Sequence, residues 1–213
     1  MENNTKFYGM FAKSVLKTKC YNDYKIRTVL RSNLEDIYCD KFIIINDELI
    51  IGKARADIVI VKDGLTGYEI KDYTDTYKSL QEQIKEYDIY FQKNYLVVGA
   101  VNIKTAATHI PPYWGIMCLT IAKYAKYGIY VLETVREAEQ NPKFNLKKQL
   151  SLLWRNELTH ILKMNKLLKC TDKTKTYIKN YLFRSVSQNT LQKQICKELL
   201  ERDWFIYRVC KME

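Results

Sequence analysis

Long apolar runs, closely paired cysteines and an apolar leader are all missing from this sequence. No stretch approaches the roughly 20 apolar residues of a membrane-spanning helix. The opening residues, MENNTK, are too polar for a signal peptide. None of the six cysteines forms a C-x-x-C pair, the short spacing that zinc sites usually show. We therefore expect a cytoplasmic protein with free, mostly buried thiols, no structural zinc and no membrane partner.

The sequence is also poor in histidine, proline and glycine. His109 and His160 are far apart, so a mechanism that pairs Ser or Cys with His has little support. Because His160 falls inside a helical apolar pattern, a structural role is expected for it. Three prolines and seven glycines leave few breaks, which predicts that the parts of the chain pack together.

Positive charge is what the sequence has in excess, and it gathers at one end. The 213 residues include 35 Lys and Arg against 24 Asp and Glu, a net charge of +11. Residues 1–40 carry 7 basic and 5 acidic groups, residues 41–135 carry 11 of each, and residues 136–213 carry 17 and 8. Cations that bind a phosphate backbone release its condensed counterions. The last third is therefore predicted to bind DNA, with RNA not excluded, and a solvated lysine-rich surface is the alternative.

Apolar spacing divides the chain into the same three regions. Residues 41–135 contain short apolar runs typical of strands, and among them one helix in which Leu80, Ile84, Tyr87 and Phe91 recur after Asp75 as N-cap. Residues 1–40 are predicted to form a helical segment. Residues 136–213 are predicted to be a basic helical region packed on the core, with an apolar stripe over 150–162. The fold class expected is α/β, with a mixed central sheet flanked by helices and with helical additions at both ends.

The stretch from Arg55 to Lys71 reads as a hairpin that carries charged residues on one face. A three-residue loop, Lys62-Asp63-Gly64, would hold Gly64 in the left-handed conformation. Asp57 would then oppose Glu69, and Arg55 would oppose Lys71, so the four side chains would share one side. The alternating residues Ile58, Ile60, Tyr68 and Ile70 would enter a core on the other side. A two-residue Asp63-Gly64 turn would instead place Asp57 and Glu69 on opposite faces.

Two neighbouring carboxylates repel each other unless a cation compensates them. Lys71 and Arg55 can do so as a surface charge ladder. A divalent cation is the other solution, since carboxylates, a backbone carbonyl and waters suit Mg²⁺. A bound cation polarises a phosphoryl oxygen and lowers the pKa of an attacking water. A lysine beside it can position or deprotonate that water.

Asp57 followed by Glu69-Ile70-Lys71 on the next strand resembles the PD-(D/E)XK nuclease superfamily, the restriction-endonuclease-like fold. Gln83 and Tyr87 resemble the Q-x-x-x-Y motif of its RecB-like members. Four short blocks add a resemblance to an uncharacterised bacterial and phage subfamily over residues 40–165: 67–71 (GYEIK), 75–76 (DT), 112–116 (PYWGI) and 152–158 (LLWRNEL). In one departure from the family name, Ala56 precedes Asp57 where proline is expected.

The resemblance implies a Mg²⁺- or Mn²⁺-dependent deoxyribonuclease. The metal ligands would be Asp57, Glu69, the Ile70 carbonyl and an upstream acid, either Glu48 or Glu35. Lys71 would assist the water, and Gln83 and Tyr87 would support the site. The nucleic-acid-binding candidates are Arg55, Lys147, Lys148 and Arg155. The alternative functions are a catalytically inactive nucleic-acid-binding module, or a protein-interaction module whose helical ends make a homo-oligomer, in either case as part of a phage, mobile-element or defence system.

Overall fold

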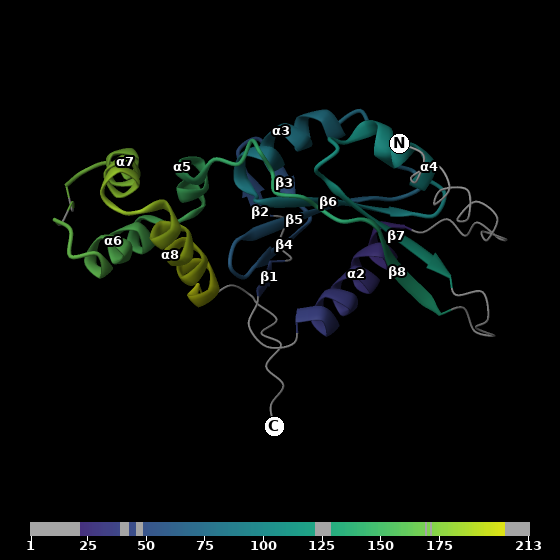
Figure 1. Ribbon diagram of the computed structural model, residues 1–213, viewed down its shortest axis with the longest axis horizontal. Helices are drawn as coiled ribbons and strands as arrows, with labels where there is room; N and C mark the ends of the chain where they lie inside the picture. The colour runs from purple at the N-terminus through teal and green to yellow at the C-terminus, as the bar shows by residue number, and fades with distance from the viewer. Residues whose placement is uncertain are drawn as a thin grey trace, which may run out of the picture.

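A six-stranded mixed sheet forms the centre of the computed structural model, which describes residues 22–38, 43–45, 49–121, 129–168, 170 and 172–202 (Figure 1). Its strands, in spatial order, are β1 (Ile43–Ile45), β4 (Ile58–Val61), β5 (Leu65–Lys71), β6 (Lys93–Gly99), β7 (Gly115–Ile121) and β8 (Tyr130–Arg136). Strands β5, β6 and β7 run parallel, and the other pairs are antiparallel. The predicted α/β class with a mixed sheet is confirmed.

Helices cover both faces of this sheet, α2 (Asp23–Tyr38) on one side and α3 (Leu80–Tyr90) with α4 (Ile103–His109) on the other (Figure 1). Ile26, Leu30 and Leu34 of α2 are buried in one apolar cluster with Ile58, Ile60, Tyr68 and Ile70, the side chains predicted to enter a core. The α3 cluster takes the alternate strand residues, including Val59, Val61 and Leu65. Because both faces are covered, β4 is a continuous buried apolar run, IVIV.

Helix α3 begins later than predicted. Its N-cap is Ser79 rather than Asp75. The Asp75 carboxylate instead accepts a hydrogen bond from the Asp72 amide at 2.9 Å. Asp75 therefore stabilises the loop after β5, and this loop carries the chain from the end of the sheet to α3.

The hairpin of β4 and β5 has the strand register that the three-residue loop predicts. Val61 pairs with Leu65, Val59 with Gly67 and Ile58 with Tyr68. Two parts of the prediction were wrong. Among the described glycines only Gly52 has a positive φ, so Gly64 is not left-handed. Arg55 does not oppose Lys71, because the ladder ends at Ile58 and Arg55 pairs with Ile50.

The first arm of the hairpin predicted over Arg55 to Lys71 is not one strand but two, which belong to different sheets. Strand β3 (Ala54–Ala56) pairs with β2 (Leu49–Ile51) in a two-stranded hairpin, and Asp57 separates it from β4. Gly52 turns this hairpin with φ +58°, and a Cβ there would collide with the Glu86 carboxylate of α3. Glycine is therefore favoured by the backbone conformation, whereas the Glu86 side chain could move aside.

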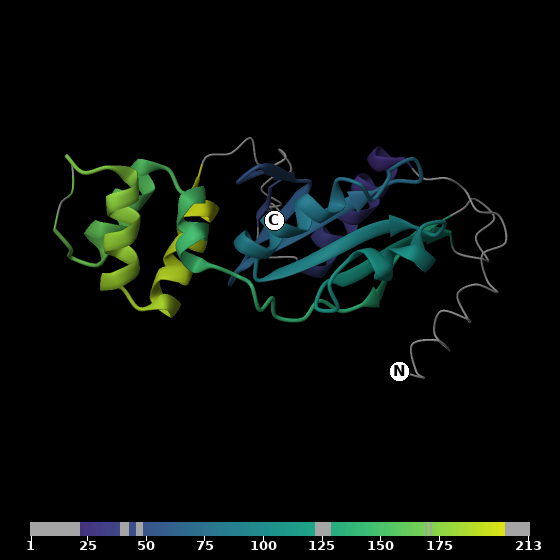
Figure 2. The same ribbon diagram turned by 90° about the horizontal axis from the view of Figure 1, so that it is seen from above.

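Four helices follow the sheet, namely α5 (Leu146–Gln149), α6 (Arg155–Met164), α7 (Lys175–Ser185) and α8 (Gln188–Glu201). They form a separate cluster at one end of the sheet (Figures 1 and 2). The stripe over 150–162 is not one helix, since a 3₁₀ turn at Leu150–Leu152 and extended residues at 153–154 interrupt it. The Gln149 side chain donates to the Tyr90 carbonyl at 2.7 Å, which ties α5 to the end of α3.

Three of the six cysteines lie in the described part of the chain, and all three are free and buried: Cys118, Cys170 and Cys196. Cys20, Cys39 and Cys210 fall outside the described residues. Within the described ranges, every helix is too short or too polar to cross a bilayer.

Candidate functional site

Asp57 lies at the break between β3 and β4, where neither sheet uses its backbone. Its amide donates to the Tyr87 hydroxyl at 3.2 Å, and its carbonyl accepts from Arg27 at 3.0 Å. Its carboxylate accepts from the Ile70 amide at 2.9 Å and from Arg27 at 3.0 Å. Side chains from α2 and α3 thus satisfy the polar groups that a β ladder would otherwise pair.

Glu69 and Lys71 extend from β5 toward α3 as a buried ion pair. The Lys71 ammonium is 2.7 Å from one Glu69 carboxylate oxygen, and the two side chains are 8% and 1% exposed. The same ammonium donates to the Gln83 side-chain oxygen at 3.0 Å. Because alternate strand residues share a face and residues i and i+4 share a helix face, the sheet and α3 bring the predicted motif residues together.

Tyr87 connects Asp57 with Glu69 of β5. Its hydroxyl donates to the second Glu69 oxygen at 2.7 Å while accepting from the Asp57 amide. The ring is fully buried between Phe91 and Trp114. The same hydroxyl lies 3.2 Å from the Tyr68 carbonyl. Packing therefore fixes a hydroxyl that holds Asp57 and Glu69 together at one end of the hairpin.

Burial and mutual repulsion make this site electrostatically costly. Burial, with repulsion from Asp57 second, raises the pKa of Glu69 to about 7. Burial also raises the pKa of Asp57 against the opposing effects of the Ile70 amide and Arg27. For Tyr87, burial and then the Glu69 and Asp57 charges raise the pKa well above its usual value. Two carboxyls that resist ionisation side by side favour an added cation.

Arg27 is the site residue that sequence reasoning missed. From α2 it donates to the carbonyl and the carboxylate of Asp57, and it also pairs with Asp23 at 3.0 Å. Arg27 and Asp23 belong to no recognisable motif, because Arg27 precedes Asp57 by 30 residues. The only available signal was the position of Arg27 next to Ile26 on an apolar helix face.

The donor set fits a hard divalent cation with waters to complete it. Two carboxylates, Asp57 and Glu69, meet at the hairpin end. Ile70 donates its amide to Asp57, and in an extended strand the carbonyl of the same residue points to the same edge. Mg²⁺ typically takes one or two protein carboxylates and keeps several waters. In the described ranges, no three His, Cys, Asp or Glu side chains are grouped around a possible metal.

The upstream acid stays open. Glu48 lies outside the described residues. Glu35, the other candidate, forms an ion pair with Arg31 of the same helix at 3.1 Å.

A cavity of about 330 Å³ gives the site access to solvent. Asp57 and Gln83 line it together with the turn of the β2–β3 hairpin and the Glu82 and Glu86 carboxylates of α3. Arg55 also lines this cavity, although it does not face Lys71 as predicted. Lys147, Lys148 and Arg155 are exposed on α5 and at the start of α6, within the helical cluster.

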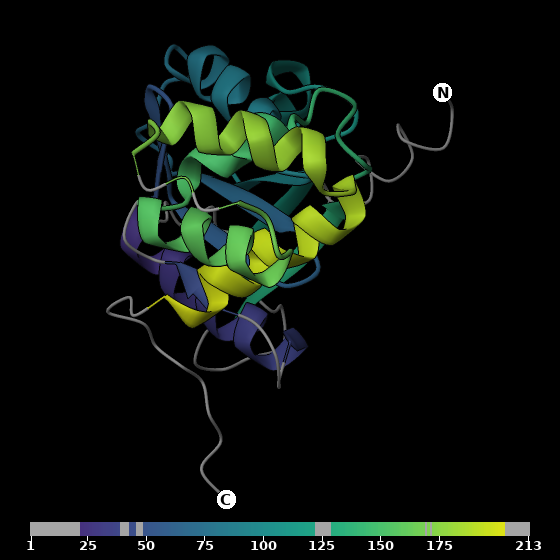
Figure 3. The ribbon, with the colours of Figure 1, turned by 90° about the vertical axis from the view of Figure 1, so that its left-hand side faces the viewer.

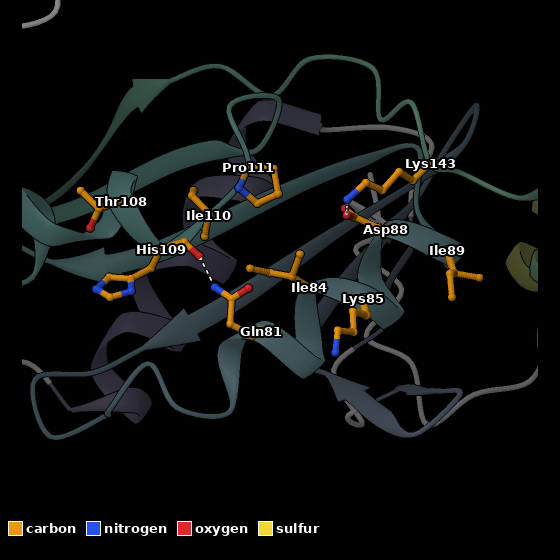
Figure 4. A pocket seen from close by; sticks show the side chains of 10 residues that line it. All are labelled: Gln81, Ile84, Lys85, Asp88, Ile89, Thr108, His109, Ile110, Pro111 and Lys143. Carbon is orange, nitrogen blue, oxygen red and sulfur yellow. Dashed lines mark hydrogen bonds and ion pairs between the residues drawn. The ribbon is translucent and has the colours of Figure 1, made fainter.

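A second cavity, of about 570 Å³, lies between α3 and the loop after α4 (Figure 4). Its buried carboxylate, Asp88, accepts from Tyr113 at 2.6 Å and from the Trp114 indole at 2.9 Å, and it pairs with Lys143 at 3.4 Å. With its hydrogen-bonding capacity used inside the fold, Asp88 anchors β7 and the following segment to α3. We read it as a structural carboxylate.

One comparison decides the family. The sequence model of a family described as bacteriophage P4 protein cII matches residues 17–208, which includes every described element. The chain belongs to the bacteriophage P4 cII family. No curated protein and no solved structure matches this cII-family chain. The family description names no reaction, so the function has to be argued from the side chains.

Proposed function

We propose that this cII-family protein is a Mg²⁺- or Mn²⁺-dependent nuclease with a restriction-endonuclease-like core, acting on DNA. One observation carries the proposal: Asp57, Glu69, Lys71, Gln83 and Tyr87, chosen from the sequence, form one connected network of hydrogen bonds and an ion pair. A structural charge ladder does not require a tyrosine and a glutamine from a separate helix at these positions.

The residues divide the chemistry among themselves. Asp57, Glu69 and the Ile70 carbonyl would hold the cation, which supplies charge neutralisation and a more acidic water. The Lys71 ammonium, held by Glu69 and Gln83, is placed to position the attacking water and to stabilise charge on the phosphate. Tyr87 fixes the Glu69 carboxylate through its hydroxyl. Arg55, at the cavity wall, is placed to contact a neighbouring phosphate.

The test is a cleavage assay with circular, linear and single-stranded DNA and with RNA, in Mg²⁺ or Mn²⁺. We expect wild-type protein to cleave DNA and Asp57→Ala and Lys71→Ala to lose cleavage while keeping their circular dichroism spectra. Asp63→Ala, which removes an exposed carboxylate from the same hairpin, is the matched control and should cleave normally. Persistent cleavage in both site variants would refute the assignment.

A non-catalytic nucleic-acid-binding module is the second candidate, and Arg27 is the observation that favours it. Arg27 already neutralises Asp57, and Lys71 already neutralises Glu69. Both carboxylates therefore have cations from the chain itself. Calorimetric titration with Mn²⁺ separates the two functions: a nuclease binds the ion and loses that binding in Asp57→Ala, whereas a module locked by Arg27 binds none.

A further inference from the structure

Four lysines from two helices gather on the helical cluster. Lys147 and Lys148 are exposed on α5, and Lys175 and Lys179 are half-buried on α7; these four are called the lysine surface below. Burial, followed by repulsion from the other three, lowers the pKa of Lys179, which places the four charges within range of one another. The Lys175 ammonium donates to the Ser151 carbonyl at 3.1 Å, which holds α7 against the segment after α5.

The acidic groups of this region are already paired elsewhere. Each acidic residue of the described segments between 141 and 202 has a basic partner within ion-pair distance: Glu157 with Arg202, Asp172 with Lys173, Glu198 with His160 and Glu201 with Lys197. None of these four pairs includes a residue of the lysine surface. The positive charge there is therefore available to an external polyanion.

An exposed aromatic ring lies next to this charge. Trp154 is 53% exposed, although its ring also lies over the Arg202 guanidinium, 4.2 Å from the ring centroid. The Lys175 ammonium contacts the Ser151 carbonyl, three residues before Trp154. Arg202 and Glu157 hold Trp154 in place, through the guanidinium under its ring and a carboxylate that accepts from its amide. A large indole left in solvent beside a group of lysines is an arrangement that single-stranded nucleic-acid sites use, because an unpaired base can stack on the ring.

We infer that the lysine surface and Trp154 bind a single-stranded polynucleotide, the lysines contacting its phosphates and the indole stacking on a base. This inference rests on the proposed nuclease function and names the part of the substrate that lies outside the catalytic site. A duplex would satisfy the lysines but would leave Trp154 without a stacking partner, because its bases are stacked inside the helix.

Helix α3 sets the spacing between this surface and the candidate site. Gln83 contacts Lys71, and Tyr90, seven residues later, accepts from Gln149 next to Lys148. Seven helical residues span about 10 Å. A strand that lies on the lysine surface can therefore reach the catalytic residues within a few nucleotides.

The experiment measures fluorescence anisotropy of labelled oligothymidine, an oligouridine and a DNA duplex of equal length, in EDTA so that cleavage does not interfere. We expect wild type to bind the single strands more tightly than the duplex. The quadruple variant Lys147→Ala, Lys148→Ala, Lys175→Ala, Lys179→Ala should lower the slope of log affinity against log salt by about 2 to 3. Substituting Lys93, Lys104, Lys163 and Lys193, exposed lysines from other parts of the surface, is the charge-matched control and should leave the slope close to wild type.

Trp154 is tested separately from the charge. Trp154→Leu keeps apolar cover over Arg202 and should lower single-strand affinity about tenfold while duplex affinity stays within about twofold. Tyr24→Ala, which removes a 75% exposed ring from α2, is the control and should change neither. Thermal melting identifies any variant whose fold is impaired.

The outcomes separate this inference from the nuclease proposal. A preference for oligothymidine or for oligouridine assigns the strand as DNA or RNA, and both support the inference. An unchanged salt slope in the quadruple variant would overturn it, as would equal loss of duplex and single-strand binding in Trp154→Leu. Binding to phosphatidylserine vesicles in place of oligonucleotides would also overturn it. Absence of cleavage with metal, with binding intact, would count against the nuclease proposal alone.

Discussion

At the scale of single residues, the candidate site is a set of buried charges that satisfy one another at a cost. Glu69 is 1% exposed and its carboxylate contacts both Lys71 and Tyr87. Burying an ion pair costs several kcal/mol per ion in desolvation, and its mutual attraction often only offsets that cost. Such a pair contributes little to stability, so its presence is better explained by a task that the charges perform.

The pH dependence of stability tests the burial of Glu69. Its pKa is about 7 in the folded protein against an ordinary 4.5. The Glu69 carboxyl binds its proton more tightly in the folded than in the unfolded protein. Its contribution to the free energy of unfolding is therefore fully present below pH 4.5 and is lost as the pH rises to 7. We expect chemical denaturation to show a fall of about 3 kcal/mol over this window.

The matched variants for this test are Glu69→Gln and Glu82→Gln. Glu69→Gln should show a much smaller fall, because the amide does not titrate. Glu82→Gln, which removes an exposed carboxylate of α3, should keep the wild-type profile. Identical profiles in Glu69→Gln and wild type would contradict the buried position of Glu69.

Tyr87→Phe tests the hydroxyl that connects Asp57 with Glu69. The change leaves a Glu69 oxygen and the Asp57 amide without this partner, so we expect the free energy of unfolding to fall by about 1–3 kcal/mol. Tyr90→Phe on the same helix is the control, since its hydroxyl has only a 3.5 Å contact with Ser151. Urea denaturation measures both, and equal losses would refute a special role for Tyr87.

At the scale of elements, the short β2–β3 hairpin decides where Asp57 lies. The chain leaves this hairpin at Ala56 and enters the main sheet at Ile58, so Asp57 occupies the crossing between two sheets. Its backbone carbonyl and amide therefore have no β-ladder partner, and they form hydrogen bonds with Arg27 and Tyr87 instead. The break in the strand thus produces the geometry that holds the carboxylate near Ile70.

Gly52→Ala tests how strongly this hairpin is specified. An L residue at φ +58° costs about 1–2 kcal/mol, and its Cβ would also meet the flexible end of Glu86. We expect thermal melting to show that loss, and the double variant with Glu86→Ala to recover only the steric part. Gly64→Ala, where φ is not positive, is the control and should cost less. A larger loss at Gly64 than at Gly52 would contradict this account.

At the scale of the whole molecule, the helical cluster closes on itself through a buried ion pair and covers one end of the sheet (Figure 3). Arg202, just after α8, forms a two-point contact with Glu157 at the start of α6, at 2.6 and 2.5 Å. The same guanidinium donates to the Leu152 carbonyl at 2.9 Å. Arg202 is thereby fixed to two residues that precede it by 45 and 50 positions, and Trp154 packs against its guanidinium.

Removing one charge of this pair should therefore be more harmful than removing both. Arg202→Met leaves Glu157 buried without a counter-charge, and we expect a loss of about 3–5 kcal/mol in chemical denaturation. The double variant Arg202→Met, Glu157→Leu should recover much of it. Lys197→Met, which breaks an exposed pair with Glu201, should cost less than about 1 kcal/mol. Full additivity in the double variant would show that the two charges do not interact.

Several features could be predicted from the sequence because they depend on local periodicity. Period-two alternation predicted that Ile58, Ile60, Tyr68 and Ile70 enter one core, and they lie in the α2 cluster. The observed register is that of the three-residue loop, one of the two turns that the sequence left open. Helical spacing placed Gln83 and Tyr87 on the face of α3 that meets β5. The division of charge located the basic region at 136–213.

The remaining features were decided by tertiary packing. Arg27 reaches Asp57 across 30 residues, the strand breaks at Asp57 instead of continuing, and the lysine surface joins α5 to α7. No local period encodes these contacts, because they depend on how separate elements dock and on which buried polar groups then need partners. The sequence by itself determined which faces are apolar and which residues could do chemistry. The tertiary structure decided which of those residues meet, since only packing brings distant charges within a few ångströms.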